Sequence, residues 1–298
     1  DSLKVAAGLL SDFGLSSATL SANSVLIPIA YYVHRRGLTQ KYRESVADAS
    51  DRAALRSWTL RSLIMPGIWG SGLDSLLRDL RQTISDQGAD GFPSAELEKR
   101  MAARGKSLAV TAEQVEDILG LTYGAARTFA VLAVLFPHVN TRNIHHVDHV
   151  FPQALLTKAN LKQAGFDPGT IEDLQTMRDQ LPNLQMLEGS ENISKSATLP
   201  SIWAANAYKS SEALQAYLDR NQIPWLPASV NEFESFFAER RSALAQHIIE
   251  TLSGPAGSAR ASDGDRSIEP EPSLNASIDE ELATTVSEGN PVNPLLTS

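Results

Sequence analysis

The sequence predicts a mainly α-helical protein of the α+β class, with one short pair of strands among the helices. Apolar residues recur at helical spacing along most of positions 22–136, and again beyond position 231. Two short apolar runs, at 144–151 and 181–187, have the length and composition of strands. At 298 residues, 42% of them apolar, the chain can form one large or two small domains with a sizeable core.

The expected helices begin and end at capping signals. Gly37 has the position of a C-terminal cap for the first helix, and Ser71 to Asp74 form a capping box that opens the third. The buried face of the last helix is predicted to consist of Phe233, Phe236, Phe237, Leu244 and Ile248. The predicted helices span residues 22–36, 52–68, 73–84, 94–104, 112–119, 125–136, 170–179 and 231 to about 252.

The residues with the clearest chemistry lie in three consecutive elements. Residues 143–152 contain the first predicted strand, which a proline ends. The second predicted strand, at 181–187, follows about thirty residues later, and residues 189–196 have the composition of a turn that enters a helix. In order, these elements carry the Asp148-His149 pair, then Asn183, and then Asn192 and Lys195.

This set of residues resembles the HNH, or ββα-metal, endonuclease motif, in both residue type and spacing. The resemblance implies a small ββα-metal nuclease core within the helical fold. The helical segments around 13–16, 24–31 and 58–80 are similar to the C-terminal halves of GmrSD-type, modification-dependent restriction enzymes. Antiphage nucleases of the SspE kind share that plan, and the resemblance covers roughly residues 10–250.

The chemistry of phosphodiester hydrolysis gives each residue a role. Asp148 and the side-chain carbonyl of Asn192 offer the hard oxygen ligands that suit Mg²⁺, for which Mn²⁺ can substitute. His149 is the expected general base, because a neutral imidazole titrates near working pH. Lys195 shares a helix face with Asn192, so its ammonium can meet a phosphate oxygen. By its match to the middle position of the motif, Asn183 would hold the histidine or the local loop in register.

Each of these residues, taken alone, also has a purely structural interpretation. Asp148 can cap a turn, and His149 can be a hydrogen-bonded histidine at a strand end. His146 shares a strand face with Asp148 and is either an additional metal ligand or phosphate contact, or a partly buried structural residue. A zinc site is not expected, because the chain has no cysteine. The main alternative function is a noncatalytic helical module that binds nucleic acid or a protein through a degenerate HNH motif.

Most of the net charge of −9 belongs to the C-terminal tail. Residues 254–298 contain eight acidic residues and two arginines, so the tail carries −6 and leaves −3 for the rest. The tail is predicted to be disordered, after a helical domain at 1–137 and a nuclease domain with C-terminal helices at 138–253. A DNA-facing surface could comprise Arg56, Arg61, Arg78, Arg81 and Lys106, although solvation or salt bridging is the default role of each.

The sequence also limits the cellular compartment and the binding partners that we expect for the protein. The absence of cysteine fits a reducing cytoplasm, and the lack of a long apolar stretch argues against a membrane span. The chain begins with Asp1 and has no basic and apolar leader, which suggests a piece of a longer protein. The resemblance implies that relatives carry an N-terminal nucleotide-hydrolysing or modification-sensing domain, and that the substrate is phage DNA or modified foreign DNA.

Overall fold

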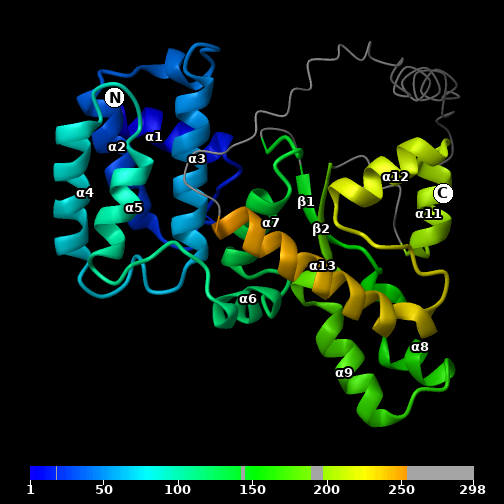
Figure 1. The fold of residues 1–298 in the computed structure, drawn as a ribbon. Helices are drawn as coiled ribbons and strands as arrows, with labels where there is room; N and C mark the ends of the chain where they lie inside the picture. The colour runs from blue at the N-terminus through cyan, green and yellow to red at the C-terminus, as the bar shows by residue number, and fades with distance from the viewer. Residues whose placement is uncertain (18, 142–144, 189–196, 254–298) are drawn as a thin grey trace, which may run out of the picture. The chain divides into compact units, whose positions relative to one another are not determined.

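The computed structural model describes residues 1–253 except for 18, 142–144 and 189–196 (Figure 1). At 145, 146, 188 and 253 it describes the backbone alone. The described chain is mainly helical with a small two-stranded antiparallel sheet, as the sequence predicts. The predicted turn and helix at 189–196 and the acidic tail at 254–298 lie outside the described residues, so the third element of a ββα core is not tested.

Helices and loops make up the chain before the sheet. The α-helices are α1 (Ser2–Asp12), α2 (Leu26–Arg35), α3 (Ala49–Ile64), α4 (Leu73–Gln87), α5 (Ser94–Ala102), α6 (Ala112–Leu119) and α7 (Ala126–Leu135). Two short 3₁₀ turns, η1 (Asn23–Val25) and η2 (Gln40–Arg43), precede α2 and α3. All the helices predicted in this region are present, and α1 is an addition that the sequence pattern did not indicate.

Beyond α7 the chain forms the sheet and a second group of helices. The sheet consists of β1 (His145–His149) and β2 (Leu184–Glu188). Between the strands lie η3 (Gln153–Leu155), α8 (Lys158–Gln163), α9 (Pro168–Arg178) and η4 (Leu181–Asn183). After β2 come α11 (Pro200–Ala207), α12 (Ser211–Arg220), η5 (Val230–Glu232) and α13 (Phe233–Ser253).

The ends of the helices agree with the predicted caps in one case and differ in another. Gly37 follows the last residues of α2 with a φ of 60°, which is the left-handed geometry expected after a helix. The capping box predicted at Ser71 is wrong: the N-cap of α4 is Gly72, which has no side chain and a φ of 71°. A capping box is present instead at α6, where the hydroxyl of Thr111 accepts a hydrogen bond from the backbone of Gln114 at 3.3 Å.

The two strands lie between two buried apolar clusters. On β2, Leu184 and Met186 belong to the first cluster, which the helices α1 to α7 largely build. Leu187 belongs to the second cluster, which involves α8, α9, α11 and α12. This division follows from the alternation of side chains along a strand. α13 also joins both clusters, because its first turns pack into the second and its C-terminal half into the first.

Arg240 of α13 binds the backbone of the segment that precedes β2. Its side chain is fully buried, and its guanidinium donates hydrogen bonds to the carbonyl oxygens of Pro182 at 2.8 Å and Asn221 at 3.2 Å. Burial lowers the pKa of Arg240 to about 10, since the charged form loses its hydration. The helix therefore holds the backbone immediately before Asn183.

The described residues up to 253 belong to one unit by their contacts. Within the described part of the chain, no helix combines the length and the apolar character needed to cross a membrane.

Candidate active site

The strand pair brings three of the predicted site residues together at one end of the sheet. In the antiparallel register Asp148 lies opposite Gln185, and His149 lies opposite Leu184. The pairing continues past the strand, because the backbone N–H of Val150 donates to the carbonyl of Asn183 at 2.7 Å. The end of β1 and the beginning of β2 therefore meet where Asp148, His149 and Asn183 were predicted to act.

Asn183 holds the loop that follows β1. Its side chain is fully buried, and its Oδ1 accepts a hydrogen bond from the backbone N–H of Phe151 at 2.8 Å. Its Nδ2 donates to the carbonyl of Phe151 at 3.0 Å and to the carbonyl of Arg178 at 2.8 Å. One amide thus ties the chain after β1 to the end of α9 and to the start of β2.

His149 is buried, with 6% of its surface exposed, and has a carboxylate partner. Its Nε2 lies 3.0 Å from Oδ1 of Asp179. The imidazole also packs against the ring of Tyr123, with centroids 4.8 Å apart and planes tilted by 43°. The sequence did not indicate either partner, because Asp179 follows α9 and Tyr123 precedes α7, far from β1 along the chain.

Asp179 is itself held in place as an anion. Arg178 approaches its Oδ2 through Nη2 at 2.6 Å, and the amide of Gln153 donates to its Oδ1 at 2.6 Å. Partial burial opposes ionisation, but the hydrogen bonds from Arg178, Gln153 and His149 outweigh it and lower the pKa of Asp179.

This carboxylate determines the tautomer of the imidazole. Because an ionised Asp179 can only accept hydrogen bonds, the proton of a neutral His149 lies on Nε2. In that tautomer Nδ1 carries a lone pair and no proton. The general base predicted at His149 would therefore work through Nδ1, with Asp179 setting the orientation of the ring.

Asp148 has different surroundings from His149. It is half-buried, and its Oδ2 accepts a hydrogen bond from Nε2 of Gln185 across the sheet at 3.2 Å. Gln185 in turn accepts a hydrogen bond from the hydroxyl of Tyr217 on α12 at 2.8 Å. Since neighbouring residues on a strand point to opposite faces, Asp148 faces the second cluster, whereas His149 faces Tyr123.

Two of the five predicted motif residues, Asn192 and Lys195, lie outside the described residues. His146 pairs with Leu187 in the sheet, but its side chain is also outside the description, so its role as a ligand stays open. Among the described side chains, no group of three or more His, Cys, Asp or Glu residues gathers in a way that could hold a metal ion. Asp148 alone supplies one hard oxygen ligand, and Mg²⁺ commonly takes only one or two protein groups.

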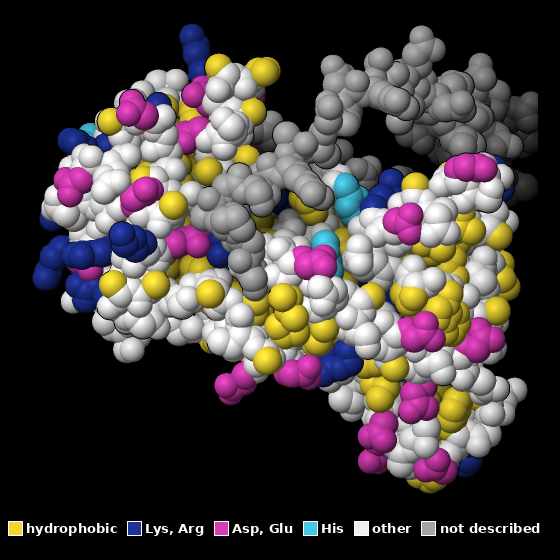
Figure 2. Space-filling view, in the orientation of Figure 1, with side chains coloured by type: hydrophobic (Ala, Val, Ile, Leu, Met, Phe, Trp, Pro, Cys, Tyr) yellow, Lys and Arg dark blue, Asp and Glu magenta, His cyan; other side chains and the backbone are white. Residues whose placement is uncertain are grey.

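The basic residues considered for a DNA-facing surface mostly have the default role that the sequence suggested, which is solvation or pairing within the protein. Arg61 is buried and forms a salt bridge with Glu98 at 2.7 Å, and Arg56 donates to the carbonyl of Ala133 at 3.0 Å. Lys106 donates to backbone carbonyls in the loop before α4. Only Arg78 and Arg81 of the set are exposed, on α4, where Figure 2 shows basic side chains mixed with acidic ones. Helix packing, which sequence spacing does not reveal, buries Arg61 and leaves Arg56 and Lys106 partly exposed.

The Asp179–His149 pair should make stability depend on pH in a defined direction. A lowered pKa of Asp179 means that its stabilisation is complete above the unfolded value of about 3.9 and is lost as the pH falls through the folded value. We expect Asp179→Asn to cost about 1 kcal/mol of unfolding free energy at pH 7 and much less near pH 3. Urea unfolding of both proteins at the two pH values checks this, and an equal cost at both would contradict it.

The described geometry thus contains a buried histidine with a carboxylate partner, an adjacent aspartate and an asparagine that fixes the intervening loop. No protein-family model matches the chain, and a comparison with curated proteins also finds no match.

Proposed function

We propose that the chain is a metal-dependent DNA endonuclease of the HNH type, whose site lies at the end of β1. The observation that supports this proposal most is the hydrogen bond between Nε2 of His149 and the ionised Asp179. His149 directly follows Asp148, the proposed metal ligand. Such a pair fixes the tautomer and the orientation of a general base. The resemblance of Asp148, His149, Asn183, Asn192 and Lys195 to the HNH motif supplies the reaction class.

In this mechanism Nδ1 of His149 removes a proton from a water molecule, and the resulting hydroxide attacks the phosphorus. The bond from phosphorus to the leaving oxygen breaks, and that oxygen takes a proton from solvent. Asp179 stabilises the imidazolium that forms. Asn183 keeps the loop after His149 fixed, and Lys195 would contact a phosphate oxygen.

Asp148 and Asn192 would hold a divalent cation, Mg²⁺ or Mn²⁺. When bound, the ion neutralises the charge that grows on the phosphate. Because Asp148 and His149 face opposite sides of β1, a phosphate must approach along the edge or the end of the strand to meet both.

The proposed substrate is DNA, with phage or modified foreign DNA as the class that the resemblance suggests. The charge of −3 outside the acidic tail does not favour strong nonspecific binding. We therefore expect cleavage to weaken as salt screens the few phosphate contacts.

Removal of the divalent cation should abolish activity. Supercoiled plasmid incubated with the purified chain and Mg²⁺ should become nicked or linear, while excess EDTA should leave it supercoiled, and added Mn²⁺ should restore cleavage. The reason is that Asp148 and Asn192 offer only oxygen ligands and no group of their own to neutralise the phosphate. Full cleavage in excess chelator would rule out the metal assignment.

The burial of His149 favours a second candidate, a noncatalytic module that binds nucleic acid or a protein. A histidine that is 6% exposed and packed on Tyr123 is also a satisfactory structural residue. The same plasmid experiment separates the two functions, since a noncatalytic module would leave the DNA uncut in Mg²⁺. A module that binds nucleic acid would in addition retard the DNA on a gel, whereas one that binds a protein would not.

A further inference from the structure

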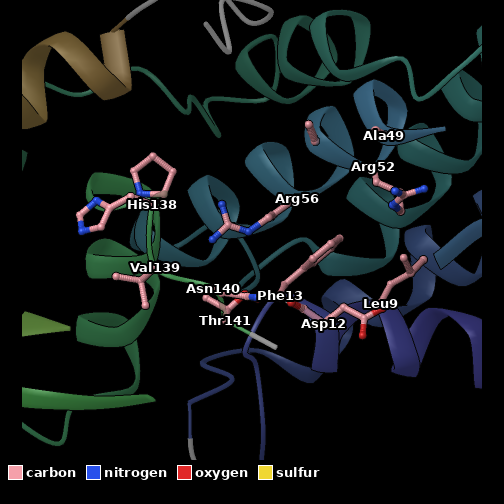
Figure 3. A pocket seen from close by; sticks show the side chains of 12 residues that line it. Leu9, Asp12, Phe13, Ala49, Arg52, Arg56, His138, Val139, Asn140 and Thr141 are labelled. Carbon is pink, nitrogen blue, oxygen red and sulfur yellow. Dashed lines mark hydrogen bonds between the residues drawn. The ribbon is translucent and has the colours of Figure 1, made fainter. Parts of the chain in front are cut away.

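A second region, apart from the sheet, has the features of a small-molecule site. A pocket of about 420 Å³ lies between α1, the first half of α3 and the segment 137–141 that follows α7. This volume falls within the range of roughly 300–1,000 Å³ that ligand pockets usually have. Figure 3 shows the side chains that line the pocket. In this view the guanidinium of Arg56 lies between His138 and Phe13.

The charges around the pocket favour an anion. Arg52 and Arg56, one turn apart on α3, both line it, and neither takes part in a salt bridge within the described part of the chain. Asp12 also lines the pocket, but Arg43 already pairs with it through two hydrogen bonds of 2.7 and 2.8 Å. The pocket therefore contains two guanidiniums, although the whole chain has a net charge of −9. Its carboxylate, that of Asp12, is neutralised by Arg43.

The burial of Arg56 strengthens the preference of the pocket for an anion. Burial lowers the pKa of its guanidinium, and among the described residues its hydrogen bond goes to the carbonyl of Ala133, which carries no charge. A cation removed from water without a carboxylate is costly, and an anion in the pocket would offset that cost. Burial and the nearby Arg220 lower the pKa of His138, so its ring is neutral near pH 7 and offers a hydrogen bond rather than a charge.

The rest of the lining is apolar. Leu9 of α1, Phe13 at the C-terminal cap of α1, and Ala53 of α3 form walls of the pocket beside the guanidiniums. A bare phosphate ion would leave these walls uncovered, whereas an organic phosphate would cover them. We infer that this pocket binds a nucleotide unit, with its phosphate on Arg52 and Arg56 and its organic part on the apolar walls of α1 and α3.

This inference does not depend on nuclease activity at β1. The nucleotide could be a free nucleoside monophosphate or one unit of a nucleic-acid strand, and both present the same chemistry. Binding can be measured in EDTA, where the proposed cleavage reaction does not run. Failure of one proposal therefore leaves the other standing.

The test is isothermal titration calorimetry of the whole chain with dAMP, deoxyadenosine, inorganic phosphate and a short single-stranded oligonucleotide. dAMP should bind at least tenfold more tightly than deoxyadenosine or phosphate, because it alone meets both the guanidiniums and the apolar walls. Arg56→Gln should weaken dAMP binding at least tenfold. Ala53→Phe, a change at an exposed lining residue, should do the same by filling the pocket.

Arg127→Gln is the matched control. Arg127 also donates to a backbone carbonyl, that of Ile64 at 2.8 Å, but does not line the pocket, so its variant should bind dAMP normally. Displacement of dAMP by the oligonucleotide would identify a strand as the ligand, and no displacement would identify the free nucleotide. The inference fails if folded wild-type protein does not bind dAMP at millimolar concentration, or if either pocket substitution leaves the affinity unchanged in a folded variant.

Discussion

His149→Ala should slow DNA cleavage by about 10²–10⁴-fold, the usual contribution of a positioned general base. The substitution removes Nδ1, the atom to which the Asp179 contact assigns the lone pair, and leaves Asp148 and Asn192 unchanged. Single-turnover rates on a duplex substrate, at saturating Mg²⁺, measure the loss. His145→Ala is the control and should keep most of the activity, since no role in the reaction is assigned to it.

His149→Ala should also lower the stability of the protein. His149 is 6% exposed and contacts both Asp179 and Tyr123. We therefore expect His149→Ala to cost about 1–2 kcal/mol of unfolding free energy. Melting curves must accompany the kinetics, so that lost activity is not confused with lost fold.

Asp179→Asn separates a positioning role from a structural one. Its amide oxygen can still accept from Nε2 of His149, but it has no charge with which to stabilise the imidazolium. The rate should fall by less than for His149→Ala, and the pH of half-maximal rate should move down, because a negative neighbour is lost. A variant with an unchanged pH profile would show that Asp179 does not act on the base.

Asn183→Ala should destabilise the protein by about 3 kcal/mol or more. The substitution leaves the N–H and the carbonyl of Phe151 and the carbonyl of Arg178 without their partner, in a fully buried position. Each buried polar group left unsatisfied costs about 1–3 kcal/mol, and the cavity adds to this. Urea unfolding at neutral pH measures the change.

Asn160→Ala is a suitable control for this experiment. Asn160 of α8 also donates a side-chain hydrogen bond, to the carbonyl of Ala154 at 2.9 Å, but it is only half-buried and this bond is exposed to solvent. Its replacement should cost less than about 1 kcal/mol, since water can satisfy the carbonyl. Equal costs at Asn183 and Asn160 would mean that Asn183 does not clamp the loop.

The sequence predicted the helices whose apolar residues follow a regular period. α6 begins and ends at the predicted residues, and the five apolar residues assigned to the buried side of α13 are all buried. The helices α1, α8, α11 and α12 were not predicted. α11 is short and combines small, polar and aromatic residues, so its packing in the second cluster, rather than its periodicity, stabilises it.

At the candidate site, too, the sequence predicted local features but not the contacts that tertiary packing creates. Local composition predicted Asp148 and His149 on one strand and Asn183 on the next. The structure places Asp148 and His149 on β1, but Asn183 lies in the 3₁₀ turn η4 just before β2, where its carbonyl accepts from the N–H of Val150. Asp179 could not be found in this way, because only tertiary packing brings it to a histidine thirty residues earlier. The burial of Arg61 between Glu98 and the carbonyls of other elements was hidden for the same reason.

Cleavage of one supercoiled plasmid by wild type and by His149→Ala, side by side in Mg²⁺, tests the proposed function most directly. The assay follows the conversion of supercoiled plasmid to nicked or linear forms by both folded proteins, free of contaminating nuclease. The account predicts conversion by the wild-type chain and supercoiled plasmid throughout the same period with His149→Ala. Equal cleavage by both proteins, or no cleavage by the folded wild type, would contradict it.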